Sequence, residues 1–341
     1  MADDDRNVSG ADQRPFDGLE PSVVLDAVET LGVACSGRLL ALNSFENRVY
    51  QLGLEDGRSV VAKFYRPARW SDATIREEHA FAIELARNEV EVVAPMADRE
   101  GETLLEHAGF RFAVYPSVGG YWPELNHAED RRQLGRLLGR MHAVSALHGF
   151  QHRPALDVQS FGYRAVETVQ RSGLLAVGLE SRYAEVTANL LQRIERRYAD
   201  IGPMRQLRLH GDLHRGNILW SERGVALVDL DDCRMGPAIQ DLWMLLDGDA
   251  EQMREQLFDI AEGYETFFEL DWREIALIEA LRGLRLMHHA AWLAHRWTDP
   301  AFPKAFPWFG TENYWVSHTH DLSEQIDKLD LSASGLSAGL H

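Results

Sequence analysis

The residues best suited to chemistry lie in one short stretch, covering residues 209–232. Asp212 and Asn217 are five residues apart, and Asp229 follows twelve residues after Asn217, beyond an apolar run. A D-x-x-x-x-N spacing is typical of a loop that supports phosphoryl transfer. A loop between buried strands can project such side chains into a cleft, because the strands fix its two ends. We therefore predict a strand, a polar loop and a short hairpin that returns Asp229 to face Asn217.

The residue types agree with that chemistry. Phosphoryl transfer uses Mg²⁺ to neutralise phosphate oxygens, and Mg²⁺ prefers hard oxygen ligands in octahedral geometry. The amide oxygen of Asn217 and the carboxylate of Asp229 are the predicted ligands, with Asp231 as a second metal ligand or an orienting residue. Asp212 is the predicted base, which would accept the proton of an acceptor hydroxyl group.

The same stretch admits two other interpretations. It could be a polar surface loop with helix caps, or His210, Asp212 and His214 could alternate as ligands of a transition metal in a hydrolase. Gly211 and Gly216 suit a tight loop, and no further His or Cys cluster completes a metal site. We expect His214 to brace the loop and His210 to form a hydrogen bond beneath it.

The upstream half of the chain supplies the expected nucleotide-binding residues. Residues 60–64 form an apolar run interrupted by Lys63, which is typical of a strand lysine that binds ATP phosphates and pairs with a glutamate on a helix. Glu78 is the predicted partner, with Glu77 as the second candidate. Ser44 lies in a polar link between two predicted strands, where backbone N–H groups and its hydroxyl could cap the phosphates. The backbone near Tyr115 is expected to pair with adenine.

The order of elements predicts an α+β fold with two lobes. An antiparallel sheet of five short strands, with one helix after the third, is expected in residues 15–116, and residues 117–120 are the predicted hinge. Helical spacing dominates from 121 to 330, interrupted by the strands around the catalytic loop. Residues 1–14 are predicted to be a disordered tail and residues 331–341 a flexible terminus. Trp122, Trp308 and Trp315 are expected in the core, with a recognition surface as the alternative.

Composition excludes several classes of protein. The chain has 341 residues and a net charge of −18, which argues against general binding to nucleic acid or to an anionic membrane. Cys35 and Cys233 are too few for a disulfide framework and suggest a reducing compartment. The N-terminus shows no apolar signal segment, and no apolar run is long enough to span a membrane. A cytoplasmic monomer is expected.

Beyond the catalytic loop, several motifs resemble the bacterial stress response kinase A family, within the aminoglycoside phosphotransferase and choline kinase branch of the protein-kinase-like fold. The resemblance runs from about residue 20 to residue 330. The segments that carry it are 42–50, 63–67, 112–120, 209–212, 228–232, 240–246 and 299–304.

The resemblance implies that Asp212 is the proton acceptor, that Asn217 and Asp229 bind Mg²⁺, and that Ser44 lies in the ATP site. It further implies phosphorylation of Ser or Thr on proteins, with autophosphorylation, in a stress response. The alternatives are a kinase acting on a small cationic alcohol and a nucleotide-binding scaffold without catalysis.

Overall fold

The computed structural model describes residues 14–222 and 224–336, and the chain divides into two compact units. The mixed unit comprises Leu19–Leu156 and Pro203–Ile278, and the described part of the helical unit comprises residues 14–18, 157–202 and 279–336. Both the sheet and the predicted catalytic loop (residues 210–217) belong to the mixed unit. Most of the predicted N-terminal tail (residues 1–13) and residues 337–341 lie outside the described residues, whereas residues 331–336 continue a helix.

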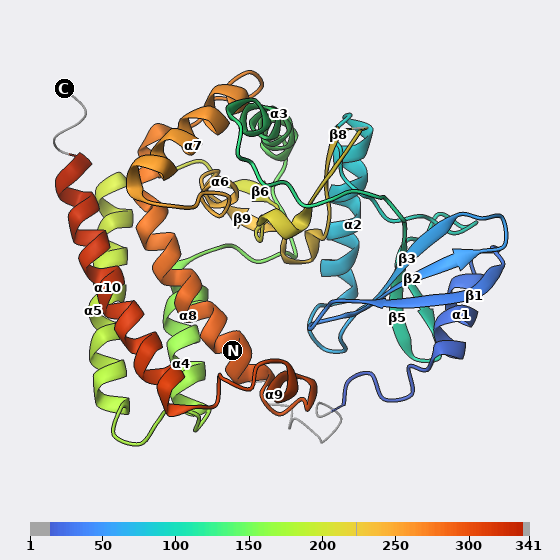
Figure 1. The fold of residues 1–341 in the computed structure, drawn as a ribbon, viewed down its shortest axis with the longest axis horizontal. Helices are drawn as coiled ribbons and strands as arrows, with labels where there is room; N and C mark the ends of the chain where they lie inside the picture. Colours follow the sequence, from blue (N-terminus) through green and yellow to red (C-terminus); the bar gives the residue numbers. More distant parts are fainter. Residues whose placement is uncertain (1–13, 223, 337–341) are drawn as a thin grey trace. The chain divides into compact units, whose positions relative to one another are not determined.

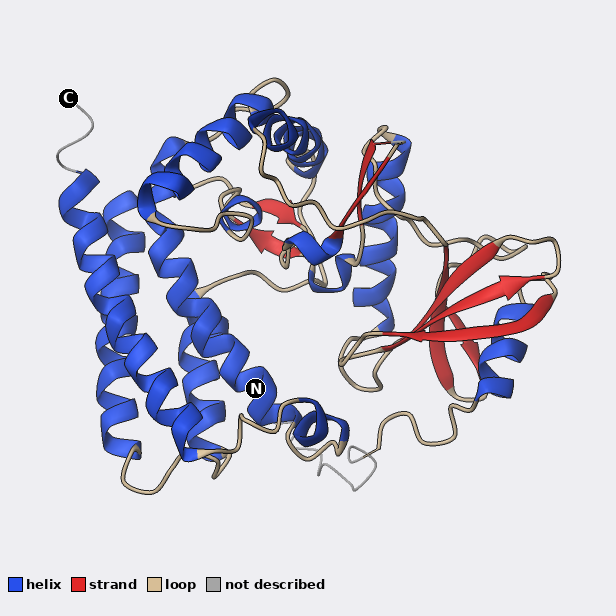
Figure 2. Cartoon of the chain, viewed as in Figure 1, coloured by secondary structure: helices blue, strands red, loops and turns tan. Residues whose placement is uncertain are grey.

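The first half of the mixed unit is the predicted five-stranded antiparallel sheet, in the order β1-β2-β3-β5-β4 (Figures 1 and 2). Helix α2 follows β3 and begins at an N-cap, Ser71, whose hydroxyl oxygen accepts a hydrogen bond from the Thr74 N–H group. The register places Lys63 opposite Val49 on β2 and Ala113 on β5, so Lys63 lies in the central strand. The bounds are α1 Pro21–Glu29, β1 Cys35–Leu42, β2 Arg48–Leu54, β3 Ser59–Phe64, α2 Asp72–Arg87, β4 Leu105–His107 and β5 Phe110–Pro116.

The second half of the mixed unit surrounds the catalytic loop with short strands and helices. Two two-stranded sheets, β6 with β9 and β7 with β8, flank the loop. Helix α3 packs against α7. The bounds are α3 Ala128–Ser145, β6 Leu207–Leu209, β7 Ile218–Ser221, β8 Gly224–Leu227, β9 Arg234–Gly236, α6 Gln240–Trp243 and α7 Ala250–Tyr264, with a 3-10 helix over Trp272–Leu277.

The helical unit contains no strand in its described residues (Figure 2). Helix α10 packs along α5, where the Arg193 guanidinium lies 3.0 Å from the Asp330 carboxylate and Arg197 donates to the Leu329 carbonyl group. The bounds are α4 Arg164–Arg171, α5 Glu180–Ile201, α8 Ile278–Arg296, α9 Ala301–Ala305 and α10 Glu312–Leu336, with a π-helical turn over Gln159–Tyr163 before α4.

Some sequence expectations need correction. Strand β9 and helix α4 were not predicted, because a three-residue strand and an eight-residue helix carry too little periodicity. Trp315 is buried as expected. The expectation of a core position is wrong for Trp122, which is 69% exposed, and for Trp308, which is 44% exposed. Single exposed aromatic residues are common on protein surfaces, so their apolar character alone does not predict burial.

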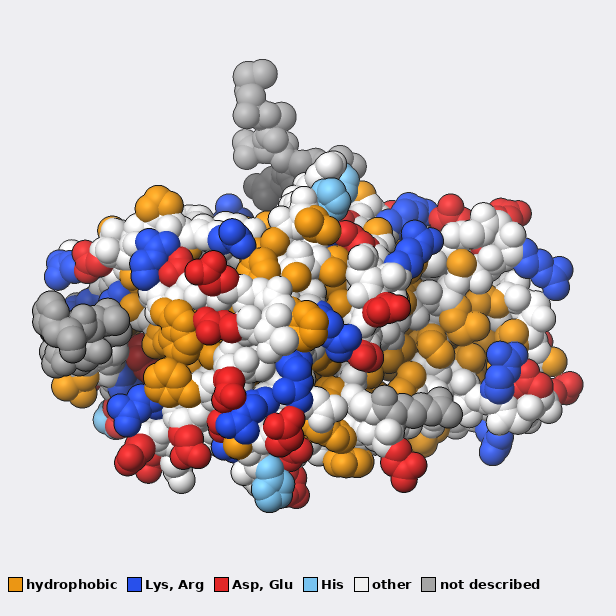
Figure 3. All heavy atoms as spheres, turned by 90° about the horizontal axis from the view of Figure 1, so that it is seen from above, with side chains coloured by type: hydrophobic (Ala, Val, Ile, Leu, Met, Phe, Trp, Pro, Cys, Tyr) orange, Lys and Arg blue, Asp and Glu red, His pale blue; other side chains and the backbone are white. Residues whose placement is uncertain are grey.

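The surface carries charged side chains of both signs (Figure 3). On the face in Figure 3, acidic and basic side chains are interspersed rather than gathered into one basic field. No helix in the described residues is long and apolar enough to cross a membrane. Cys35 and Cys233 are both free thiols.

Candidate active site

The catalytic loop is anchored to the start of helix α6. The Asp241 carboxylate accepts hydrogen bonds from the backbone N–H groups of His210, at 2.7 Å, and Gly211, at 2.9 Å. Gly211 has φ +85°, and a Cβ atom there would overlap the Asp232 carbonyl oxygen. The loop therefore needs glycine at this position for both its backbone conformation and its close approach to the 229–232 turn.

Asp241 is itself held by a buried polar chain. The His142 ring lies between the Asp241 carboxylate, 3.2 Å from Nε2, and the Tyr264 hydroxyl, 2.8 Å from Nδ1. Asp241 and His142 are fully buried, so these contacts satisfy polar groups that water cannot reach. Helices α3, α6 and α7 thus position the loop from beneath.

The loop and the hairpin bring Asp212, Asn217 and Asp229 together. The Asn217 Nδ2 atom donates to the Asp212 carbonyl oxygen at 2.9 Å, and the Asn217 carbonyl oxygen accepts from the Val228 N–H group at 3.0 Å. Asp229 lies two residues after the end of β8 and adopts a left-handed backbone conformation, with φ 62°. Non-glycine residues rarely adopt this conformation, and such residues cluster at functional sites.

Lys63 connects the sheet to this turn. Its Nζ atom lies 3.1 Å from Asp229, 3.0 Å from Asp231 and 3.4 Å from Glu78. Burial alone would lower the pKa of Lys63, but these three carboxylates raise it well above its ordinary value. Lys63 is therefore a fixed positive charge at the point where α2, β3 and the 229–232 turn meet.

Asp229 and Asp231 differ in their surroundings. The Asp229 side chain is 56% exposed, whereas that of Asp231 is 5% exposed. The Asp231 carboxylate pairs with Lys63 and Arg69 and accepts from the Asn47 amide at 3.1 Å. Burial would raise its pKa, but Arg69 and Lys63 hold that pKa well below its usual range. Asp231 is thus a buried anchor for the surrounding cations, and Asp229 is the open carboxylate.

The oxygen donors present fit a divalent cation. Because the Asn217 Nδ2 atom is bonded to a carbonyl oxygen, the side-chain oxygen of Asn217 remains to act as a ligand. The side-chain oxygen of Asn217 and the exposed carboxylate of Asp229 are the groups that would hold Mg²⁺. The Asp231 carboxylate already pairs with Lys63 and Arg69, so it fits the role of orienting these cations better than that of a metal ligand.

Three predicted residues, Glu77, Ser44 and Tyr115, have other surroundings. Glu77 does not contact Lys63, because its carboxylate instead accepts the backbone N–H groups of residues 151–153. Ser44 is half-buried in the link between β1 and β2. Tyr115 pairs with Val61 in the sheet, and its hydroxyl lies 3.1 Å from that of Tyr65.

Both histidines of the loop form local hydrogen bonds. His210 Nε2 lies 2.9 Å from the Val228 carbonyl oxygen, and His214 Nδ1 accepts from the Gly216 N–H group at 3.0 Å. Among the residues that the structure describes, no three His, Cys, Asp or Glu side chains converge to hold a metal ion.

Sequence reasoning missed four residues of the site. Asn47, Arg69, Arg153 and Asp241 each bond directly to a residue of the loop, the turn or α2. Asp241 and Asn47 fall within motifs that carried the family resemblance, so those motifs were the available signal. Arg153 lies in an irregular segment with no periodicity to indicate burial.

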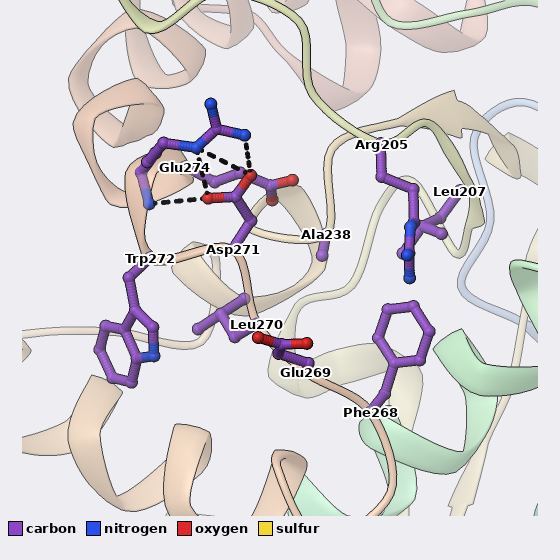
Figure 4. Close-up of a pocket in the computed structure, with 10 residues that line it drawn as sticks. Arg205, Leu207, Ala238, Phe268, Glu269, Leu270, Asp271, Trp272 and Glu274 are labelled. Carbon is purple, nitrogen blue, oxygen red and sulfur yellow. Dashed lines mark hydrogen bonds and ion pairs between the residues drawn. The ribbon is translucent and has the colours of Figure 1, made fainter.

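A cavity of about 550 Å³ lies elsewhere in the mixed unit. Figure 4 shows Asp271 and Glu274 on one side of it and Arg205 with Phe268 on the other. Glu274 is 2% exposed and accepts the Ile239 N–H group at 3.0 Å, just before α6. Burial raises the pKa of Glu274 to about 7. None of the predicted site residues lines this cavity.

Comparisons with known proteins agree with this geometry. Residues 38–278 match the Phosphotransferase enzyme family. "Stress response kinase A" of Escherichia coli O157:H7 is 46% identical over 314 residues, 92% of this chain and 94% of that protein. "Serine/threonine protein kinase RdoA" of Salmonella typhimurium LT2 is 45% identical over 310 residues, 91% of this chain and 93% of that protein.

Two solved structures share the fold. A structure described as "Amicoumacin kinase hAmiN in complex with AMP-PNP, Ca2+ and Ami" has a TM-score of 0.70 at 20% identity, covering 90% of this chain and 93% of the other. A microcompartment-associated aminopropanol kinase has a TM-score of 0.67 at 20% identity, covering 94% and 99%. The α+β kinase-like fold expected from the sequence is thereby confirmed. The chain is a kinase of the phosphotransferase enzyme family and belongs among its stress response kinase A members.

Proposed function

We propose that this kinase transfers the γ-phosphoryl group of ATP, with Mg²⁺, to Ser and Thr hydroxyl groups of proteins, itself included, during a stress response. The observation that carries the proposal is the position of Lys63, held between Glu78 and Asp229 beside the Asp212–Asn217 loop. The names of the relatives at 45–46% identity support the protein acceptor and the stress response.

The residues divide the work of the reaction. Lys63 would bind the α- and β-phosphates, and Glu78 would hold the lysine in place. Asn217 and Asp229 would hold Mg²⁺, which neutralises charge on the phosphates. Asp212 orients the acceptor hydroxyl group and accepts its proton. The hydroxyl oxygen forms a new bond to the γ-phosphorus as the bond to the ADP oxygen breaks.

The acceptor class can be tested directly. The purified chain is incubated with γ-labelled ATP, Mg²⁺, a generic protein substrate and, separately, a panel of aminoglycosides and choline-like alcohols. Acid hydrolysis of the labelled protein identifies the phosphorylated residue. We expect label on Ser and Thr. Rapid consumption of ATP in the presence of one alcohol, with no label on protein, would instead establish a small-molecule kinase.

A further inference from the structure

Arg153 joins three segments of the mixed unit through a buried guanidinium group. Its Nη2 atom donates to Glu78 Oε2 at 2.6 Å, and its Nη1 atom donates to the Asp231 carbonyl oxygen at 2.6 Å. Its Nε atom donates to the Thr74 carbonyl oxygen at 3.0 Å. The side chain is 0% exposed. One residue therefore ties helix α2 to the turn that carries Asp229.

Glu78 is consequently held by two cations rather than one. Its Oε1 atom faces Lys63 at 3.4 Å, while Oε2 binds Arg153 at the shorter distance of 2.6 Å. A carboxylate bonded at both oxygens cannot rotate away from either partner without breaking a charge-assisted hydrogen bond in a buried site. Arg153 therefore fixes the orientation in which Glu78 meets Lys63.

The position of Arg153 is itself fixed. The Glu77 carboxylate accepts the N–H groups of Gln151, His152 and Arg153 at 2.5, 2.8 and 2.7 Å. The guanidinium group also lies over the Trp70 ring, 4.9 Å from its centre. Adjacent glutamates of α2 thus have different partners: Glu77 holds the backbone of the 151–153 segment, and Glu78 binds the Arg153 side chain.

We propose that Arg153 is a positioning residue for phosphoryl transfer, which holds the Lys63–Glu78 pair and the Asp229 turn in one arrangement. This role rests on the proposed function, because it acts only through residues assigned to that reaction. This role requires the planar guanidinium group of arginine, because its Nε, Nη1 and Nη2 atoms must donate to three different acceptors. A lysine at this position keeps the charge but cannot make all three contacts.

Arg208 provides a matched control. It is also a buried arginine that pairs with a glutamate of α2, Glu84, at 2.6 Å, and it donates to the Val144 carbonyl oxygen at 3.1 Å. It likewise lies over an aromatic ring, that of Phe81, at 4.6 Å. It does not contact Glu78 or the Asp229 turn through any of these bonds. A purely structural loss should therefore be similar for Arg208→Lys and Arg153→Lys.

The experiment compares both variants with the wild-type chain in kcat, in KM for ATP, in melting temperature and in backbone hydrogen exchange. We expect Arg153→Lys to lower kcat about 10- to 100-fold, as for other residues that orient a metal ligand. We also expect faster exchange in residues 72–78 and 229–233 together. Arg208→Lys should melt at a similar temperature to Arg153→Lys, retain kcat within about threefold of the wild type and leave exchange at 229–233 unchanged.

The outcomes separate this role from the proposed function. A wild-type chain that transfers no phosphoryl group would overturn the proposed function and this role with it. An active wild type with equal kcat in Arg153→Lys and Arg208→Lys would overturn only the role of Arg153. If Arg153→Lys does not fold, Glu77→Gln replaces it, because the neutral amide weakens the hold on residues 151–153. Full kcat in a folded Glu77→Gln would then overturn the role.

Discussion

At the scale of single residues, the site is a buried network of charges with one exposed carboxylate. Lys63 meets three carboxylates, and Arg69 and Arg153 add positive charge at Asp231 and Glu78. Buried charges are tolerated when they are paired and hydrogen-bonded. The network fixes Lys63 in the central strand and leaves the Asp229 carboxylate exposed.

The contrast between Asp229 and Asp231 gives a prediction. Asp229→Asn should lower phosphoryl transfer about 100- to 1,000-fold with little change in stability, because its side chain is 56% exposed. Asp231→Asn should lower the free energy of unfolding by about 3–5 kcal/mol, because it removes the counter-charge of Lys63 and Arg69. Urea unfolding and initial rates check both variants. If the Asp229→Asn and Asp231→Asn variants were equally stable and lost phosphoryl transfer equally, the prediction would be contradicted and Asp231 would be a metal ligand as well.

The sequence was sufficient to predict the site residues that lie close to one another along the chain. Asp212, Asn217 and Asp229 lie within 18 positions of one another on a strand–loop–hairpin, so spacing and periodicity were sufficient to bring them together. Arg153 contacts Glu78 across 75 positions and Asp231 across 78. No local pattern encodes such a contact, because it depends on how α2 packs against distant segments. The choice between Glu77 and Glu78 was open for the same reason.

At the scale of elements, α3 and α7 approach closely enough to require glycine. A Cβ atom at Gly139 would overlap the Tyr264 carbonyl oxygen, and one at Gly135 would overlap that of Ile260. These helices carry His142 and Tyr264, which hold Asp241 beneath the catalytic loop. If a larger residue pushed α3 and α7 apart, His142 and Tyr264 would move, and Asp241 would lose its support beneath the loop.

Gly139→Ala should destabilise the protein, although the same change in an exposed helix stabilises it by about 0.5–1 kcal/mol. The backbone overlap should cost about 1–3 kcal/mol, as for other overpacked sites. Gly283→Ala in α8 is the matched control, because the three atoms nearest to its Cβ atom belong to side chains rather than backbone: Ile194 Cδ1 at 3.3 Å, Leu190 Cδ2 at 3.4 Å and Gln325 Cγ at 3.5 Å. Thermal unfolding of both checks the prediction. A Gly139→Ala variant at least as stable as the control would contradict it.

The raised pKa of Glu274 predicts a pH dependence at the start of α6. Its ordinary value is 4.5, and burial raises it to about 7, so the folded state keeps a proton that the unfolded chain releases between those values. The stability from this group is fully present below pH 4.5 and is lost as the pH rises through about 7. The loss should amount to about 3 kcal/mol.

Glu274→Gln tests this dependence, because the amide oxygen can still accept the Ile239 N–H group and carries no charge. Urea unfolding at pH 5 and pH 8 should show the wild type losing stability relative to this variant at the higher pH. Glu269→Gln, at an exposed carboxylate of the same cavity, is the control for the loss of a carboxylate charge there. A constant difference between the wild type and Glu274→Gln at both pH values would contradict the prediction.

At the scale of the whole molecule, every residue assigned to the reaction lies in the mixed unit. The order of strands and helices predicted the α+β architecture, because each segment is locally consistent with its element. It did not predict that residues 157–202 and 279–336 form a unit of their own, since their helices lie in two separate stretches of chain. The predicted hinge at 117–120 and the acceptor class stay predictions.

The most direct test of the account is label transfer from γ-labelled ATP by the wild-type chain and by Asp212→Asn. Both are assayed with Mg²⁺, alone and with a generic protein substrate, after circular dichroism has shown equal folding. The account predicts label on Ser and Thr of the wild type and of the substrate, reduced at least about 100-fold in the variant, which lacks the carboxylate that accepts the proton. Equal labelling by the two proteins would contradict it.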